Sequence, residues 1–195
     1  MKYNLSEITE LIKDRRSIYP EDYSSRKVHE EIIEHVLQNA IWAPNHGMTQ
    51  PWRFHVYTGD GLLRLAKDLP EFYKNHTPEE QFKPSKYERF RERAESVSVM
   101  IFVSVERTPE SRIPEIEEIE AVACAVQNMA LTCTAYGLGS FWSSPKFIYT
   151  KEFGEYLGLT EQGTCLGLFY MGYTEKEWPK SHRKPLEYVS TWIDQ

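Results

Sequence analysis

The stretch 116–145, IEEIEAVACAVQNMALTCTAYGLGSFWSSP, decides the fold of this chain. Apolar and small residues recur at helical spacing over 116–136, and 121–135 is small or apolar on almost every side. Such a pattern is typical of a helix at the centre of a protein. Gly137 is the expected residue just beyond the helix end, because glycine readily adopts the left-handed conformation there. The residues 138–143 then predict a short strand.

The rest of the chain alternates between helical and extended patterns. Asn4 and Glu7 form a capping pattern at the start of a first helix, which should end near Arg15. A second helix must stop before Pro44, since the residue before proline avoids the helical conformation. Further strands are predicted at 53–58, 96–105 and 165–172, and further helices at 28–40, 62–69 and 151–157.

Composition excludes several classes of protein. The 195 residues indicate one domain, 1–195, and the net charge of −6 argues against nucleic-acid binding driven by bulk charge. The longest strongly apolar stretch, 97–105, is far shorter than the about 20 residues of a membrane-spanning helix. The N-terminus lacks the apolar core of a secretion signal. Three cysteines without metal or disulfide spacing favour a cytoplasmic protein, and we expect no metal site.

Two segments stand apart from this core. The stretch 70–95 is polar and interrupted by prolines, so we expect a surface excursion of helical pieces that carries exposed rings such as Phe82 and Tyr87. It either borders a binding site as a lid or is a decorative insertion. The segment 173–195 is also polar but ends in aromatic and branched residues, a pattern typical of an arm that packs on something.

Three short motifs could carry chemistry. Arg15, Arg16 and Ser17 can bind a phosphate, or they can simply place cations at a helix C-terminus. The loop 43–52, APNHGMTQPW, can recognise the edge of a heterocycle, or it can be a turn that satisfies its own polar groups. The stretch 136–145 can admit a flat ligand near its glycines, or it can be a turn beside a core tryptophan.

In this order and spacing, the three motifs resemble the nitroreductase family. A helix ending in Arg-Arg-Ser, a helix running into Ala-Pro-Asn-His-x-x-x-Gln-Pro-Trp-x-Phe, and a late Gly-x-Gly-x-x-Trp are similar to its small members. The resemblance implies an α+β fold, with a mostly antiparallel sheet wrapped by helices around a long central helix. It also implies an intertwined homodimer that binds two FMN molecules at its interface.

The resemblance further implies which residues contact the flavin. They belong to the three motifs and to a basic site near the C-terminus: Arg15, Arg16, Ser17, Trp42, Pro44, Asn45, His46, Gln50, Gly139, Trp142, Ser143, Ser144 and Arg183. Two positions depart from the family pattern. Ser143 stands where small members often carry Arg, and Ser181 stands where larger relatives commonly have Lys.

The function implied is an FMN-dependent oxidoreductase. Such an enzyme uses NAD(P)H to reduce nitroaromatics, quinones or related electron-poor acceptors by a ping-pong mechanism, with the flavin rather than a protein side chain carrying the chemistry. The alternatives are a flavoenzyme of the same fold that uses oxygen or a halogenated aromatic, a non-enzymatic flavin-binding protein, and a phosphate-binding module without flavin.

Overall fold

The computed structural model describes residues 2–194. Met1 and Gln195, the two ends of the predicted domain, lie outside the described residues. The helices are α1 (Leu5–Asp14), α2 (Glu30–Ala40), α3 (Asp60–Asn75), α4 (Pro84–Ser96), α5 (Glu115–Ala135) and α6 (Lys151–Tyr156). The strands are β1 (Trp52–Tyr57), β2 (Val99–Glu106), β3 (Leu138–Ser143) and β4 (Gly163–Tyr173).

The strands form one four-stranded sheet in the order β1-β2-β4-β3, and each neighbouring pair is antiparallel. Phe54 of β1 pairs with Val103 of β2, and Val103 pairs in turn with Gly167 of β4. The four predicted strands are therefore present. The predicted start of β2 at residue 96 was wrong: Ser96 ends α4, where the Val97 N–H still donates to the Arg93 carbonyl at 3.1 Å, and β2 begins only at Val99.

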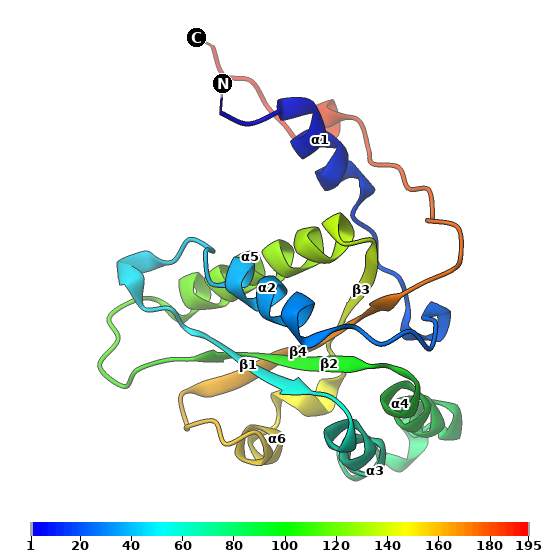
Figure 1. Ribbon diagram of the computed structural model, residues 1–195. Helices are drawn as coiled ribbons and strands as arrows, with labels where there is room; N and C mark the ends of the chain where they lie inside the picture. Colours follow the sequence, from blue (N-terminus) through cyan, green and yellow to red (C-terminus); the bar gives the residue numbers. More distant parts are fainter. Residues whose placement is uncertain (1, 195) are drawn as a thin grey trace.

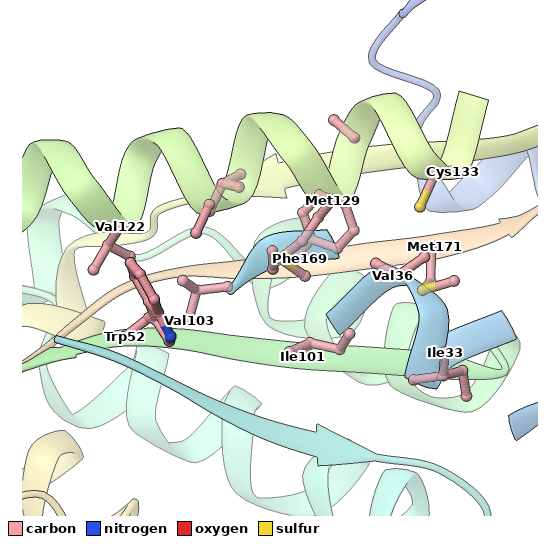
Figure 2. Close-up of a cluster of buried hydrophobic side chains, with 14 of the residues drawn as sticks. Ile33, Val36, Trp52, Ile101, Val103, Val122, Met129, Cys133, Phe169 and Met171 are labelled. Carbon is pink, nitrogen blue, oxygen red and sulfur yellow. The ribbon is translucent and has the colours of Figure 1, made fainter. Parts of the chain in front are cut away.

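Helices cover both faces of the sheet (Figure 1). On one face, α5 and α2 bury Val122, Met129 and Val36 against the inward side chains of β2 and β4 (Figure 2). The prediction of a long central helix is confirmed, because these side chains of α5 and α2 are fully buried. Gly137 follows the end of α5 with φ +70°, which is the left-handed conformation expected there.

The other face of the sheet is covered by α3, α4 and α6, which enclose a second apolar cluster. The predicted helix end before Pro70 was wrong, since α3 continues through this proline to Asn75. Proline in a helix interior removes one backbone hydrogen bond. Burial of Leu65, Leu69 and Tyr73 on the same side of α3 outweighs that loss.

The rings of the polar stretch 70–95 are not exposed, which corrects the sequence-based expectation. Phe82 and Tyr87 pack against the second cluster, and the Phe82 ring stacks on Tyr73 with centroids 5.5 Å apart. The Tyr73 hydroxyl also accepts a hydrogen bond from the Lys83 backbone N–H at 3.0 Å. The stretch is thus a helical hairpin whose rings pack in or against the second apolar cluster.

The first helix and the last segment lie together away from the sheet (Figure 1). None of the described residues of α1 is buried, so its apolar residues Leu5, Ile8 and Ile12 are exposed. The C-terminal segment is tied to the end of α1, where the Trp178 indole N–H donates to the Asp14 carbonyl at 2.6 Å. Within residues 2–194, no helix combines the length and apolar character that a membrane crossing requires.

Candidate functional site

The Arg15-Arg16-Ser17 motif lies at the outer edge of the sheet. Ser17 forms a parallel bridge with Ser140 of β3, and the Ile18 N–H donates to the Ser140 carbonyl at 3.0 Å. Gly139 makes this approach possible, because a Cβ there would lie 2.7 Å from Cβ of Ile18. The side chain of Ile18 fills the space on this side of Gly139, and the contact of Gly139 with a flat ligand stays a prediction.

Arg183 returns from the far end of the chain to this motif. Partial burial, and then the positive charges of Arg183 and Arg16, lower the pKa of the Arg15 guanidinium. Among the described residues, no carboxylate lies within ion-pair distance of any of these three arginines. Mutually repelling guanidiniums without a carboxylate are typical of a site for an anionic ligand. We call these three residues the arginine cluster.

Arg16 differs from the other two members of the cluster. Its guanidinium donates to the carbonyls of Pro179 and Arg15, both at 2.9 Å, and to the carbonyl of Lys13. It therefore caps the C-terminus of α1 and fastens the C-terminal segment, which is the structural alternative considered for this motif. Within residues 2–194, Arg15 donates no such bond, and Arg183 donates only to its neighbours, the Ser181 hydroxyl and the His182 carbonyl.

The second motif forms a tight loop at the start of β1. Met48 and Gln50 have φ of +55° and +48°, which is a strained conformation for residues other than glycine. The Asn45 side-chain oxygen accepts from the Gln50 N–H at 3.0 Å and so holds the loop in this shape. Trp42, just before the loop, is 84% exposed. Strain of this kind concentrates at ligand sites, which supports a binding role for the loop.

Polar side-chain contacts lie between this loop and the N-terminal end of α5. The His46 ring Nδ1 lies 2.6 Å from Oε2 of Glu117. Next to it, the Arg107 Nε donates to Oε2 of Glu118 at 2.7 Å, and Glu118 is only 2% exposed. Arg107 also donates to the Ile113 carbonyl at 2.9 Å, and Ile113 lies under Gly47 of the loop.

The first two motifs lie at opposite ends of α5 (Figure 1). The loop contacts Glu117 in the first turn of α5, whereas Ser17 pairs with Ser140, just after its last turn. A helix of 21 residues spans about 30 Å. A single chain therefore brings Arg15, Ser17 and Arg183 together but leaves Asn45, His46 and Gln50 far away.

The residues of the third motif lie in two different environments. The Trp142 indole lies against the backbone of Gly167, where any side chain would collide with it. Ser143 and Ser144 instead line a cavity of about 430 Å³ between the end of β3 and the hairpin of α3 and α4. A tryptophan that is 40% exposed and two cavity-lining serines thus share one strand end.

Sequence reasoning missed the charged lining of this cavity. Lys86, Arg89 and Arg93 of α4 border it together with Lys146. The signal was present in the sequence, because positions 86, 89, 90 and 93 fall on one face of a helix. Because the stretch 70–95 is polar throughout, the basic face of this helix did not stand out from the other charged residues.

The chain is an α+β protein with a cluster of arginines at the edge of an antiparallel sheet. The model of the nitroreductase family matches residues 12–173, and the chain belongs to this family. The chain is 26% identical over 182 residues to a Bacillus subtilis protein named "Putative NAD(P)H nitroreductase YfhC", with 93% of this chain and 91% of that one covered.

Solved structures show the same fold. The chain superposes on a nitroreductase-like family protein from Bacillus cereus with a TM-score of 0.81 and 28% identity, covering 100% of this chain and 99% of that one. The FMN-dependent nitroreductase NfnB from Mycobacterium smegmatis, solved with NADPH, matches with a TM-score of 0.74 and 19% identity, covering 97% and 100%. The predicted family and α+β fold are therefore confirmed.

Proposed function

We propose that this chain is an FMN-dependent oxidoreductase that uses NAD(P)H to reduce electron-poor acceptors such as nitroaromatics or quinones. For a nitroaromatic, the net reaction is NAD(P)H + H⁺ + ArNO₂ → NAD(P)⁺ + ArNO + H₂O. Two electrons leave the nicotinamide and enter the nitro group, one N–O bond breaks, and the oxygen leaves as water. In the ping-pong order, the oxidised nicotinamide departs before the acceptor occupies the same space.

The observation that carries this proposal is the arginine cluster without a carboxylate partner. A phosphate monoester fits it, because charge-assisted bonds from Arg15 and Arg183 can neutralise a dianion. Ser17, whose backbone forms the bridge to β3, follows Arg16 directly and adds a hydroxyl to the motif. Arg16 contributes charge, while its own donors hold the backbone that positions the other two.

The strand β3 connects the phosphate site with the cavity. Ser140 pairs with Ser17, and Ser143 lines the cavity three residues further on, about 10 Å along an extended strand. Bound FMN would supply the two-electron chemistry, and the protein would supply binding and electrostatics. The residues Ser143 and Ser144 would contact the flavin ring, and their cavity would admit the acceptor.

A homodimer completes this site. Leu5, Ile8 and Ile12 of α1 are exposed, as are apolar residues near the end of the chain such as Trp192, which is 85% exposed. A second copy arranged about a twofold axis would cover them and bring its loop 43–50 to the arginine cluster. Asn45, His46 and Gln50 would then face a flavin whose phosphate is held by the other chain.

We also propose a cytoplasmic location and no nucleic-acid or membrane partner. Free cysteines are usual in a reducing compartment, and the three cysteines of this chain are free. Burial raises the pKa of Cys133 to about 12 and that of Cys165 to about 11. Both side chains therefore remain protonated thiols, which are poor nucleophiles.

The visible spectrum of the purified protein tests the activity. We expect a yellow protein that releases FMN on denaturation and whose flavin absorbance bleaches on anaerobic addition of NAD(P)H. A nitroaromatic acceptor should then restore the colour. Release of FAD alone, or no flavin uptake from added FMN, would contradict the proposal. FMN binding without bleaching would indicate a flavin-binding protein that is not an enzyme.

Mixed dimers test the shared site. We expect Arg15→Ala and Asn45→Ala each to weaken FMN binding, because each damages a different half of the site. Refolded together, the two variants should regain tight binding at about a quarter of the sites, since half of the dimers are mixed and each has one intact site. No recovery, or a monomer that retains flavin, would contradict the dimeric site. A mixture of Arg15→Ala with Arg183→Ala is the control, because both changes damage the same half.

A further inference from the structure

We infer that the cavity beside Ser143 and Ser144 selects flat aromatic acceptors that carry a carboxylate. This inference rests on the proposed function and names the substrate class of that site. Four cationic side chains line the cavity, from Lys86, Arg89, Arg93 and Lys146, and none of the lining residues is acidic.

The positive charge is only partly neutralised. Glu21 accepts a bidentate pair of bonds from Arg93, with distances of 3.0 and 3.1 Å, and its Oε1 also lies 3.9 Å from Nε of Arg89. One carboxylate is therefore shared by two guanidiniums. Among the described residues, Lys86 and Lys146 have no carboxylate within ion-pair distance. The cavity thus keeps a surplus of positive charge that an anionic ligand would neutralise.

The apolar part of the cavity favours a flat ring. Phe90 and Phe147 pack edge to face with centroids 5.3 Å apart, and Tyr73 lies 5.5 Å from Phe90. Tyr73 and Phe147 are buried, so this floor is rigid. A cavity of about 430 Å³ matches a small aromatic molecule, and its hydroxyl groups at Thr77, Ser143 and Ser144 add hydrogen-bonding partners.

The arrangement separates this anion site from the arginine cluster. Arg15 and Ser17 meet β3 at Ser140, at the outer edge of the sheet, whereas Arg89 and Arg93 belong to α4 on the face of the second apolar cluster. The chain therefore has two cationic sites along β3. The first suits the phosphate of a cofactor, and the second suits the carboxylate of an acceptor.

Paired acceptors of equal shape test the inference on the FMN-loaded protein. We expect kcat/KM for 4-nitrobenzoate to exceed that for uncharged 4-nitrobenzamide. In Arg89→Gln and Lys146→Gln this preference for the anion over the amide should fall by about 3- to 10-fold. Arg91→Gln is the matched control, because Arg91 lies on the same helix, pairs with Glu88 and does not line the cavity. Equal rates for the two acceptors in the unaltered protein would overturn the inference.

A binding measurement separates this inference from the proposed function. Calorimetry with 4-methylbenzoate and 4-methylbenzamide, neither of which is reduced, should show tighter binding of the anion and a smaller difference in Arg89→Gln. This result needs no enzymatic activity, so it stands even if acceptors are not turned over. Loss of FMN in Arg89→Gln, but not in Arg91→Gln, would assign the cavity to the cofactor and overturn the inference while leaving the flavoenzyme proposal intact.

Discussion

The two ends of α5 use arginine in opposite ways. At the N-terminal end, Arg107 is paired with the buried carboxylate of Glu118 and with a backbone carbonyl. At the other end, Arg15 and Arg183 lie close together with no recorded carboxylate partner among the described residues. A satisfied arginine stabilises the fold, whereas a cluster of unsatisfied ones is costly unless a ligand neutralises it. Pairing, rather than residue type, therefore distinguishes structural from ligand-binding charges in this molecule.

The largest effect should follow from removing the satisfied arginine. Arg107→Met leaves the Glu118 carboxylate buried without a partner, so we expect the free energy of unfolding to fall by about 3–5 kcal/mol. Urea unfolding at fixed protein concentration measures this loss. The double variant Arg107→Met with Glu118→Leu should regain most of it. A single variant as stable as the double one would contradict the comparison.

Removing an unsatisfied arginine should change binding rather than stability. We expect Arg15→Ala to weaken FMN binding by about 1.5–3 kcal/mol, the range for hydrogen bonds to charged groups. Unfolding of the FMN-free protein should change by less than about 0.5 kcal/mol, as for other substitutions away from buried features. Fluorescence titration with FMN gives the affinity, and Arg64→Ala, an exposed change on α3, serves as the control. A large loss of stability in Arg15→Ala would show that Arg15, like Arg107, stabilises the fold, and would contradict the comparison.

The smallest effect should come from the exposed pair at the N-terminal end. Glu117→Gln removes the charge opposite His46, and both side chains of this pair are substantially exposed. Such pairs contribute about 0.2–1 kcal/mol, so the expected loss is within that range. Screening by salt should reduce the loss further, which unfolding at about 0.1 and 1 M salt can test. A loss of unfolding free energy as large as that of Arg107→Met would show that the exposure of a pair does not determine how much the pair stabilises the fold.

Much of the fold could be predicted because local patterns determine it. The apolar run of α5, the glycine after it and the extended residues of β2 and β4 all point to the structures found. Pro70 misled the prediction because a local rule for proline was outweighed by the burial of Leu69 and Tyr73, which depends on distant residues. Likewise, the polar composition of 70–95 led to the expectation of exposed rings, whereas Tyr73 is buried in the second apolar cluster and Phe82 packs against it.

The candidate site was predictable only in parts. Motifs identified Arg15 and Asn45, but nothing in the sequence shows that α5 holds them far apart within one chain. The buried Glu118 could have been recognised, because it lies one helical turn before Val122 on the apolar face of α5. Its partner Arg107 could not, since the bend of the intervening loop decides the pairing.

The length of α5 has a consequence for how this protein can diverge. If the two half-sites meet across a twofold axis, the helix fixes the spacing between them. One inserted residue would move one half-site by about 1.5 Å and turn it by about 100° relative to the other. Loops such as that between β2 and α5 can absorb insertions without this effect. We therefore expect related chains to vary in length at their loops, while the number of residues from Glu117 to Ser140 stays constant.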